Sequence, residues 1–223
     1  MRSASADPTT RERIRDAAVL RFARDGFGAS VRSIASDAGV SPALVIHHFG
    51  SKDELHAECD EQVLAEIRQA KNESIDELAA GQSILHRFAA TDEYAPILGY
   101  VLRSLQDGGP VGRSFIEQMI EDAVGYTKHG VDAGLVKPSL DEAARARYLV
   151  LSALGTLMLE LTLNPQEDPS DISGLVRGFL MTTYLPMLEL YSEGFFTNRR
   201  MLDEYLLYVP DPPQDTATEP ASE

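Results

Sequence analysis

The feature that most constrains this chain is a close succession of helix start and stop signals near its N-terminus. Thr9 and Glu12 have the spacing of a capping box, in which each side chain satisfies a free backbone N–H, so a helix is expected to start near Thr10. Serines mark three further starts and glycines three ends: Ser30, Ser41, Ser51, Gly26, Gly39 and Gly50. Short helices with very short connections therefore follow one another.

The second and third of these helices are joined by Gly39-Val40-Ser41, a three-residue turn that contains glycine. This arrangement is typical of a helix-turn-helix, whose second helix enters the major groove of DNA. Pro42 stands at the first position of the third helix, where its missing N–H costs nothing. Apolar residues are expected to tie the two helices to the first one: Ile34, Ala35, Ala38, Val40, Val45 and Phe49. The opposite face of the third helix is then free to meet base edges.

Helical spacing continues to the end of the chain, and no alternating strand pattern of useful length occurs. A fourth helix is expected from Ser51 to about Lys71. A Ser139/Glu142 capping box is expected to start one later helix, and Pro186 to kink the following helix or end it early. The further helices are expected near 76–90, 94–106, 110–133, 139–163, 171–192 and 197–208. The predicted fold is all-α.

Charge divides the chain into two parts. The net charge is −15, yet residues 1–52 carry eight basic and five acidic side chains and are therefore net positive. Such asymmetry indicates a nucleic-acid-binding module joined to an acidic body. We expect a helix-turn-helix domain over 1–52, with the helix from about 51 linking it to a helical ligand-binding and dimerisation domain over 53–209, and a disordered acidic tail over 210–223.

Several other classes of protein are disfavoured. Cys59 is the only cysteine, so no intrachain disulfide forms, and its expected role is that of a small buried residue. The apolar run from Tyr148 to Leu163 falls short of the roughly 20 residues that span a bilayer, and no secretory signal is recognised, so a soluble cytoplasmic protein is expected. Phosphate loops, nucleophile elbows and metal-ligand spacings are absent, so no enzyme, metal or cofactor is expected.

The segment GASVRSIASDAGVSPALVIHHFGSKDEL, from Gly28 to Leu55, resembles the DNA-binding signature of the tetracycline-repressor (TetR) family. The likeness covers residues 10–58 and consists of an Ile-Ala core pair, Gly-Val-Ser, a short helix ending in an aromatic residue, and Ser-Lys-x-x-Leu. It implies a homodimer that binds a palindromic double-stranded DNA operator and is released by a small molecule. Activation in place of repression also occurs in the family.

The resemblance also implies which residues meet DNA. Arg32 would contact a base or a phosphate, His48 and Lys52 would bind phosphates, and the third helix would present a reading face. The full set of DNA-binding candidates is Ser30, Arg32, Ser41, Pro42, Ala43, Leu44, Ile46, His47, His48 and Lys52. Two of them depart from the family, which usually has threonine at position 44 and tyrosine at position 46. Leu44 could meet a thymine methyl group or turn inward against the first helix.

The remaining helices are expected to form a dimer interface and a ligand cavity. The helices near 139–163 and 171–192 are apolar on nearly every side, so they must be covered all round. We expect one face to meet the core and another to meet a second copy; the alternative is a monomer that buries both helices internally. The cavity, for an apolar or amphipathic effector, has these candidate lining residues: Phe88, Tyr100, Phe115, Met119, Tyr126, Leu154 and Met158. His86, Arg103 or Glu160 could add polarity, and the sequence does not choose among them.

Two alternatives stay open at this stage. One is a helical adaptor whose helix-turn-helix contacts protein, and the other is a ligand-binding protein without sequence-specific DNA binding. The combination of Arg32, His48 and Lys52 argues against the adaptor, because these side chains suit phosphates.

Overall fold

The structure is a computed structural model that describes residues 9–83, 85–86, 91–164 and 171–209. Within these residues the regular secondary structure is entirely helical, so the predicted all-α fold class is confirmed. The predicted tail over 210–223 lies outside the described residues, as does Phe88.

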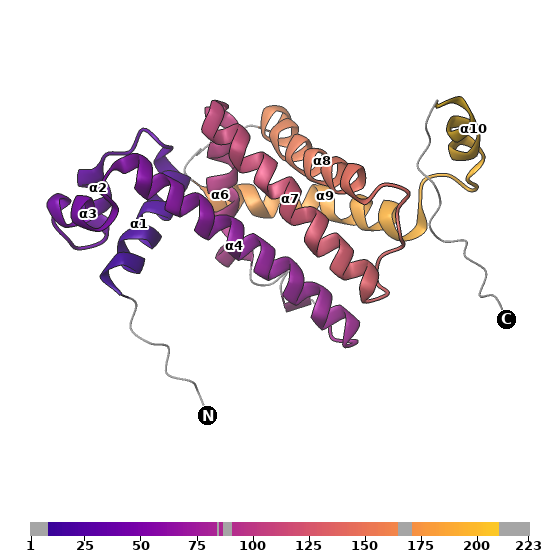
Figure 1. Ribbon diagram of the computed structural model, residues 1–223, viewed down its shortest axis with the longest axis horizontal. Helices are drawn as coiled ribbons and strands as arrows, with labels where there is room; N and C mark the ends of the chain where they lie inside the picture. The colour runs from indigo at the N-terminus through magenta and orange to yellow at the C-terminus, as the bar shows by residue number, and fades with distance from the viewer. Residues whose placement is uncertain (1–8, 84, 87–90, 165–170, 210–223) are drawn as a thin grey trace.

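The first three helices form a small unit at one end of the molecule (Figure 1). They are α1 (Thr10–Asp25), α2 (Val31–Asp37) and α3 (Pro42–Phe49). Each begins at the side chain that the sequence predicts: Thr9, Ser30 and Ser41 accept backbone N–H groups of the first turn, and Thr9 forms a reciprocal capping box with Glu12.

The larger part of the chain is a layered arrangement of long helices. These are α4 (Lys52–Ala79), α6 (Thr91–Asp107), α7 (Pro110–Asp132), α8 (Glu142–Leu163), α9 (Ile172–Glu193) and α10 (Arg200–Tyr208). α4 leaves the N-terminal unit and runs along α7, α7 packs on α8, and α6 lies between α1 and α9. In Figure 1, α10 stands apart from this body, beyond the end of α9.

Two predicted boundaries were wrong, and of the two alternatives predicted for Pro186, a kink or an early helix end, the early end is excluded. α4 does not stop near Lys71 but continues to Ala79, because no glycine or proline interrupts it before Gly81; a separate helix therefore does not begin at 76. α8 is capped by Asp141, whose carboxylate accepts the Ala144 N–H at 2.8 Å, while Ser139 instead donates its N–H to Glu142. α9 does not end early at Pro186 but runs through it to Glu193.

The hydrophobic core is shared between the small unit and the body. One cluster of buried residues extends from α1, α2 and α3 through α4 to α6, α7 and α8, and includes the fully buried Phe22, Leu55 and Tyr100. A second cluster joins α6, α8 and α9 around Leu157 and Val176. Because the first cluster crosses from the small unit into the body, the two parts are packed together and not merely tethered.

One helix of the described residues, α8, is long and apolar enough to cross a membrane by length and composition, so the predicted shortfall in length was wrong. Such a single helix is weak evidence for a membrane protein. In this fold α8 lies against α7, with Ala146, Val150 and Leu157 buried.

Candidate nucleic-acid interface

The turn between α2 and α3 has the backbone geometry that a helix-turn-helix requires. Gly39 adopts φ = 66°, in the left-handed region that glycine enters without steric cost. The Val40 N–H then donates to the Ala35 carbonyl at 2.9 Å, and the Leu44 N–H donates to Ser41 Oγ at 3.2 Å. Backbone and side-chain hydrogen bonds thus fix the angle between the two helices.

α3 has one buried face and one free face. Val45 and Phe49 are buried in the shared core, whereas the predicted reading residues on the other face are solvent-accessible. Seven of the predicted residues are exposed and three are half-buried: Ser30, Arg32, Ser41, Pro42, Ala43, Ile46 and His47 are exposed, and Leu44, His48 and Lys52 are half-buried. The structure therefore places nine of the ten on the α1–α3 unit and Lys52 at the start of α4, and Leu44 is neither fully exposed nor fully in the core.

Arg32 and Lys52 differ in how far they are already engaged. Among the described residues, nothing forms a hydrogen bond or ion pair with the Arg32 guanidinium, which projects from the first turn of α2. Lys52 Nζ donates to the Phe27 carbonyl at 2.5 Å. An ammonium group has three N–H donors, so Lys52 keeps two for an anion while its position is fixed from the loop after α1.

Arg11 is a residue of this unit that the sequence reasoning missed. Its guanidinium donates to the backbone carbonyl of His48 and to the Glu58 carboxylate, and it lies over the Phe49 ring with 4.5 Å to the centroid. Arg11 therefore ties the C-terminal end of α3 to α1 and α4. These partners are 37 and 47 residues away in the sequence, and no local pattern signals them.

A second arginine orients α2 on α1. Arg21 donates through Nε and Nη2 to the two carboxylate oxygens of Asp37, at 2.6 and 2.5 Å, and also reaches Asp25 at 2.8 Å. Such a bidentate arginine–carboxylate pair fixes the relative orientation of the two side chains and also stabilises their contact. Hydrogen bonds from Arg24 and then Arg21 lower the pKa of Asp25 to about 2.

The small unit meets the body at an aromatic junction between α1, α4 and α6. The Tyr100 ring lies 6.4 Å from Phe22 and 5.3 Å from Phe27, and its hydroxyl donates to Asp60 at 2.7 Å. Burial raises the pKa of Asp60, while the Tyr100 hydroxyl acts in the opposite direction by stabilising the carboxylate. The His56 and Phe27 rings are in contact, with 4.0 Å between their centroids, and burial lowers the pKa of His56.

Arg103 adds a polar link at the same junction. It donates to the carbonyl oxygens of Ala23 at 3.3 Å and Arg24 at 2.8 Å. The last carbonyls of a helix lack partners within the helix and carry partial negative charge, so a guanidinium is well suited to them. Arg103 of α6 thus caps the C-terminal end of α1, and its side chain is directed at α1 and not at a ligand cavity in the body.

The described residues of the predicted ligand-binding set lie on α6, α7 and α8 and belong to two core clusters. Tyr100 and Phe115 are buried with ring centroids 5.9 Å apart, Leu154 is buried, and Met119, Tyr126 and Met158 are half-buried against the core clusters. A hollow of about 260 Å³ lies between α8 and α9. Its lining residues are Leu157, Glu160, Leu161, Asn164, Leu175, Gly178, Phe179 and Thr182. Of the three polar candidates, Glu160 is the one that borders it.

Comparison with known proteins gives consistent results for both parts of the chain. Residues 14–59 match the model for bacterial regulatory proteins of the tetR family, and residues 92–197 match a tetracyclin repressor-like C-terminal domain. The chain is 42% identical over 202 residues to the HTH-type transcriptional regulatory protein RaaS of Mycobacterium tuberculosis, covering 91% of this chain and 94% of the relative. It is 39% identical over 70 residues to the regulator BetI of Brucella anthropi, which is 31% of this chain and 36% of that protein.

Solved structures show the same fold at low sequence identity. SmeT, the repressor of the Stenotrophomonas maltophilia multidrug efflux pump SmeDEF, aligns with a TM-score of 0.51 at 21% identity, over 78% of this chain and 89% of that one. A tetR-family transcriptional regulator from Streptomyces coelicolor aligns with a TM-score of 0.53 at 17% identity, over 85% and 86% of the two chains.

The helix-turn-helix and the matched family models define the class as a helix-turn-helix transcriptional regulator. More particularly, the chain belongs to the TetR family, as its sequence indicates. Regulators of this family bind DNA operators and dimerise.

Proposed function

We propose that this protein is a repressor that binds a palindromic operator as a symmetric homodimer and releases it when a small molecule binds the body. The observation that carries the DNA-binding part is the free face of α3, flanked by Lys52 and by the Arg32 guanidinium, which has no partner among the described residues. Arg32 is assigned to a base or a phosphate, and Lys52 and His48 to phosphates. Ser30, Ser41 and the remaining α3 residues complete the interface.

The test of this assignment is footprinting of the DNA upstream of the protein's own gene. A symmetric dimer should protect two half-sites about 10 base pairs apart, or a multiple of that spacing, because each α3 occupies a successive major groove. Arg32→Ala should weaken protection, whereas Arg113→Ala should not, since Arg113 is exposed on α7, outside the α1–α3 unit. Continuous protection without half-sites would contradict the proposal.

For the dimer we propose a four-helix interface made by α8 and α9 of each copy. Large apolar side chains on these helices are left uncovered within one chain. Met181 and Leu185 are 85% and 75% exposed, and Tyr148, Leu151, Leu159, Leu163, Leu188 and Tyr191 are also exposed. Exposed apolar surface on this scale marks an interaction site. Sedimentation of Met181→Glu/Leu185→Glu should show monomers, and Glu189→Gln, on the same helix, should sediment as the unmodified protein.

For the effector we propose an apolar or amphipathic molecule held in the body between α6, α7, α8 and α9, with Glu160 as the polar contact. Two observations support this proposal. A hollow lies between α8 and α9, and its lining includes residues of the second core cluster, to which α6 also contributes. A ligand there acts on α6, and α6 contacts α1 through Tyr100 and Arg103. DNA release would then follow from a change in the spacing of the two α3 helices.

Reciprocal linkage provides the test of release. If a ligand weakens operator binding by some factor, the operator must weaken ligand binding by the same factor, and allosteric coupling is typically about 5- to 150-fold. A metabolite library can be screened for molecules that lower operator affinity without dissociating the dimer. A tight ligand with equal affinity for free and DNA-bound protein would contradict the mechanism.

A further inference from the structure

The segment that ends the described part of the chain has an apolar face that no described residue covers. α10 has no buried residue, and Leu207 and Tyr208 are 89% and 83% exposed. Met201, Tyr205 and Tyr208 recur at positions i, i+4 and i+7, so they form one face of the helix. The matched C-terminal domain of the family ends at residue 197, so α10 lies beyond it.

A helix this short does not persist on its own. Isolated helices of fewer than about 12–15 residues are marginal in water, and protein helices are stabilised mainly by packing of an apolar face. α10 has only nine residues. Its stability therefore requires a surface on which Met201 and Tyr205 become buried.

The charged side chains of the segment restrict the kind of surface that could cover α10. Arg199 pairs with Asp203 at 2.8 Å and Arg200 with Glu204 at 2.8 Å, so each positive charge of the helix is neutralised by an acid on the same helix. Anionic membranes and DNA attract segments with an excess of lysine and arginine. The paired charges therefore disfavour an anionic membrane or DNA as the surface that covers α10.

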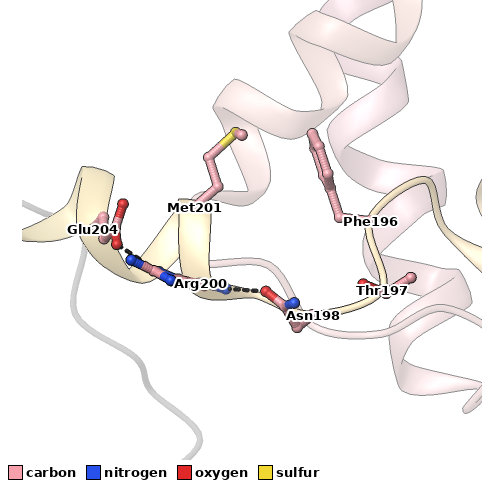
Figure 2. Close-up of a pocket in the computed structure, with 6 residues that line it drawn as sticks. All are labelled: Phe196, Thr197, Asn198, Arg200, Met201 and Glu204. Atoms are coloured by element: carbon pink, nitrogen blue, oxygen red, sulfur yellow. Dashed lines mark hydrogen bonds and ion pairs between the residues drawn. The ribbon is translucent and has the colours of Figure 1, made fainter.

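A hollow at the start of α10 is formed by this segment alone. A hollow of about 270 Å³ lies between the loop before α10 and its first turn, and it is lined by residues 196–204 alone. Figure 2 shows Phe196 and Met201 pointing to the same side of the segment, away from the Arg200–Glu204 pair. No residue of α8 or α9 lines this hollow, and Figure 1 shows α10 beyond the end of α9.

We propose that α10 is an arm that packs against the α8–α9 surface of a second copy of this chain, and that the arm of the second copy packs in the same way on the first. Exposed apolar side chains follow one another along the chain from Leu185 and Tyr191 of α9 through Phe195 to α10, so a copy that covers the end of α9 lies next to the arm as well. Residues 194–199 between the helices can extend roughly 20 Å, about twice the diameter of a helix. The inference rests on the proposed dimer and adds a second contact to it.

The arm is large enough to matter for a dimer. Aromatic side chains bury about 150–250 Å² each, so Phe195, Phe196, Tyr205 and Tyr208 together could supply several hundred Å². A stable interface needs about 800 Å² from each partner. The arm therefore complements α8 and α9 and does not replace them.

The first test measures dimer affinity by sedimentation of the full chain. Met201→Asp/Tyr205→Asp should raise the dimer dissociation constant by about 10- to 100-fold, since each lost apolar contact is partly offset by the ordering cost of the arm. The matched control Arg199→Gln/Asp203→Asn changes only the polar side and should leave the constant unchanged. Equal dimer affinities for the apolar-face variant and the control would overturn the proposal.

The second test locates the arm directly. The chain contains no tryptophan, so Tyr205→Trp introduces a single indole on the arm. Its emission should be blue-shifted and shielded from iodide in the dimer, and solvent-exposed after dilution to monomer or in the Met181→Glu/Leu185→Glu background. Shielding that persists in the monomer would place the arm on its own chain, and shielding by phosphatidylglycerol vesicles would place it on a lipid surface; either result overturns the proposal.

The two proposals fail in distinguishable ways. A dimer in sedimentation with an exposed indole would leave the α8–α9 interface intact and reject the arm alone. A chain that sediments as a monomer at all concentrations would reject the proposed dimer, and the arm with it.

Discussion

Replacement of Arg103 by methionine should loosen the junction between the DNA-binding unit and the body. Methionine keeps much of the apolar stem but removes the N–H groups that donate to the Ala23 and Arg24 carbonyls at 3.3 and 2.8 Å. Both carbonyls then lose a partner at the negative end of α1. The change therefore removes a contact that is remote from DNA and from the hollow between α8 and α9.

The size of the effect follows from the geometry. A hydrogen bond to a charged group contributes about 1.5–3 kcal/mol, and a buried acceptor left without a partner costs a similar amount. The bond to Ala23 is long and Arg103 is half-buried, so the site retains some access to water. We therefore expect the Arg103→Met variant to lose about 1.5–3 kcal/mol of unfolding free energy, the value for one strong bond.

The assay is urea unfolding followed by circular dichroism at one fixed protomer concentration, because dimer stability depends on concentration. Arg113→Met is the matched control: Arg113 is exposed on α7 and forms no ion pair or hydrogen bond within the described residues. The free energy of unfolding of the control should lie within about 0.5 kcal/mol of that of the unmodified protein, as is usual for surface substitutions. An Arg103→Met variant as stable as the control would refute this account of the junction.

Further predictions concern DNA contacts, a buried carboxyl and the cysteine. In anisotropy titrations, Lys52→Ala should weaken binding equally on operator and random DNA, whereas Arg32→Ala should also reduce base preference if it reads a base; equal losses on both DNAs would reject that role. Tyr100→Phe removes the donor to Asp60 and should cost about 1–3 kcal/mol in urea unfolding at pH 7. Burial raises the pKa of Asp60 above its unfolded value, so ionisation of this carboxyl lowers stability as pH rises through that window, and the Tyr100→Phe cost should shrink as pH falls and the carboxyl becomes protonated. Burial also raises the pKa of the Cys59 thiol, so Ellman's reagent should react with it only at the rate of unfolding, and rapid labelling of the native protein would contradict its buried position.

The local part of the structure was predictable from the sequence because its signals are local. The caps at Thr9, Ser30 and Ser41 satisfy N–H groups only three residues away, and Gly39 meets a backbone requirement at its own position. The turn and the orientation of the reading helix follow from these short-range bonds. The end of α4 was misjudged for the converse reason, since a helix without a strong stop signal extends as far as its tertiary contacts support it.

The contacts between the two parts of the chain were not predictable. Arg11 and Arg103 reach partners between 37 and 80 residues away, and nothing in their immediate neighbours distinguishes them from solvated arginines. The sequence offered Arg103 as a polar ligand contact, but the structure directs it to the end of α1. Only the packing of α6 on α1 determines that choice.

The central claim, that a symmetric dimer reads DNA with α3, is tested most directly by the salt dependence of binding to the upstream DNA and to a scrambled duplex of the same composition. With Lys52, His48, Arg32 and helix N-termini from two subunits, about 6–10 phosphates are engaged, which predicts a slope of log K against log salt of roughly −5 to −9. At physiological salt the specific duplex should bind at least about 10³-fold more tightly than the scrambled one. A slope near zero, or equal affinity for the two duplexes, would contradict the account.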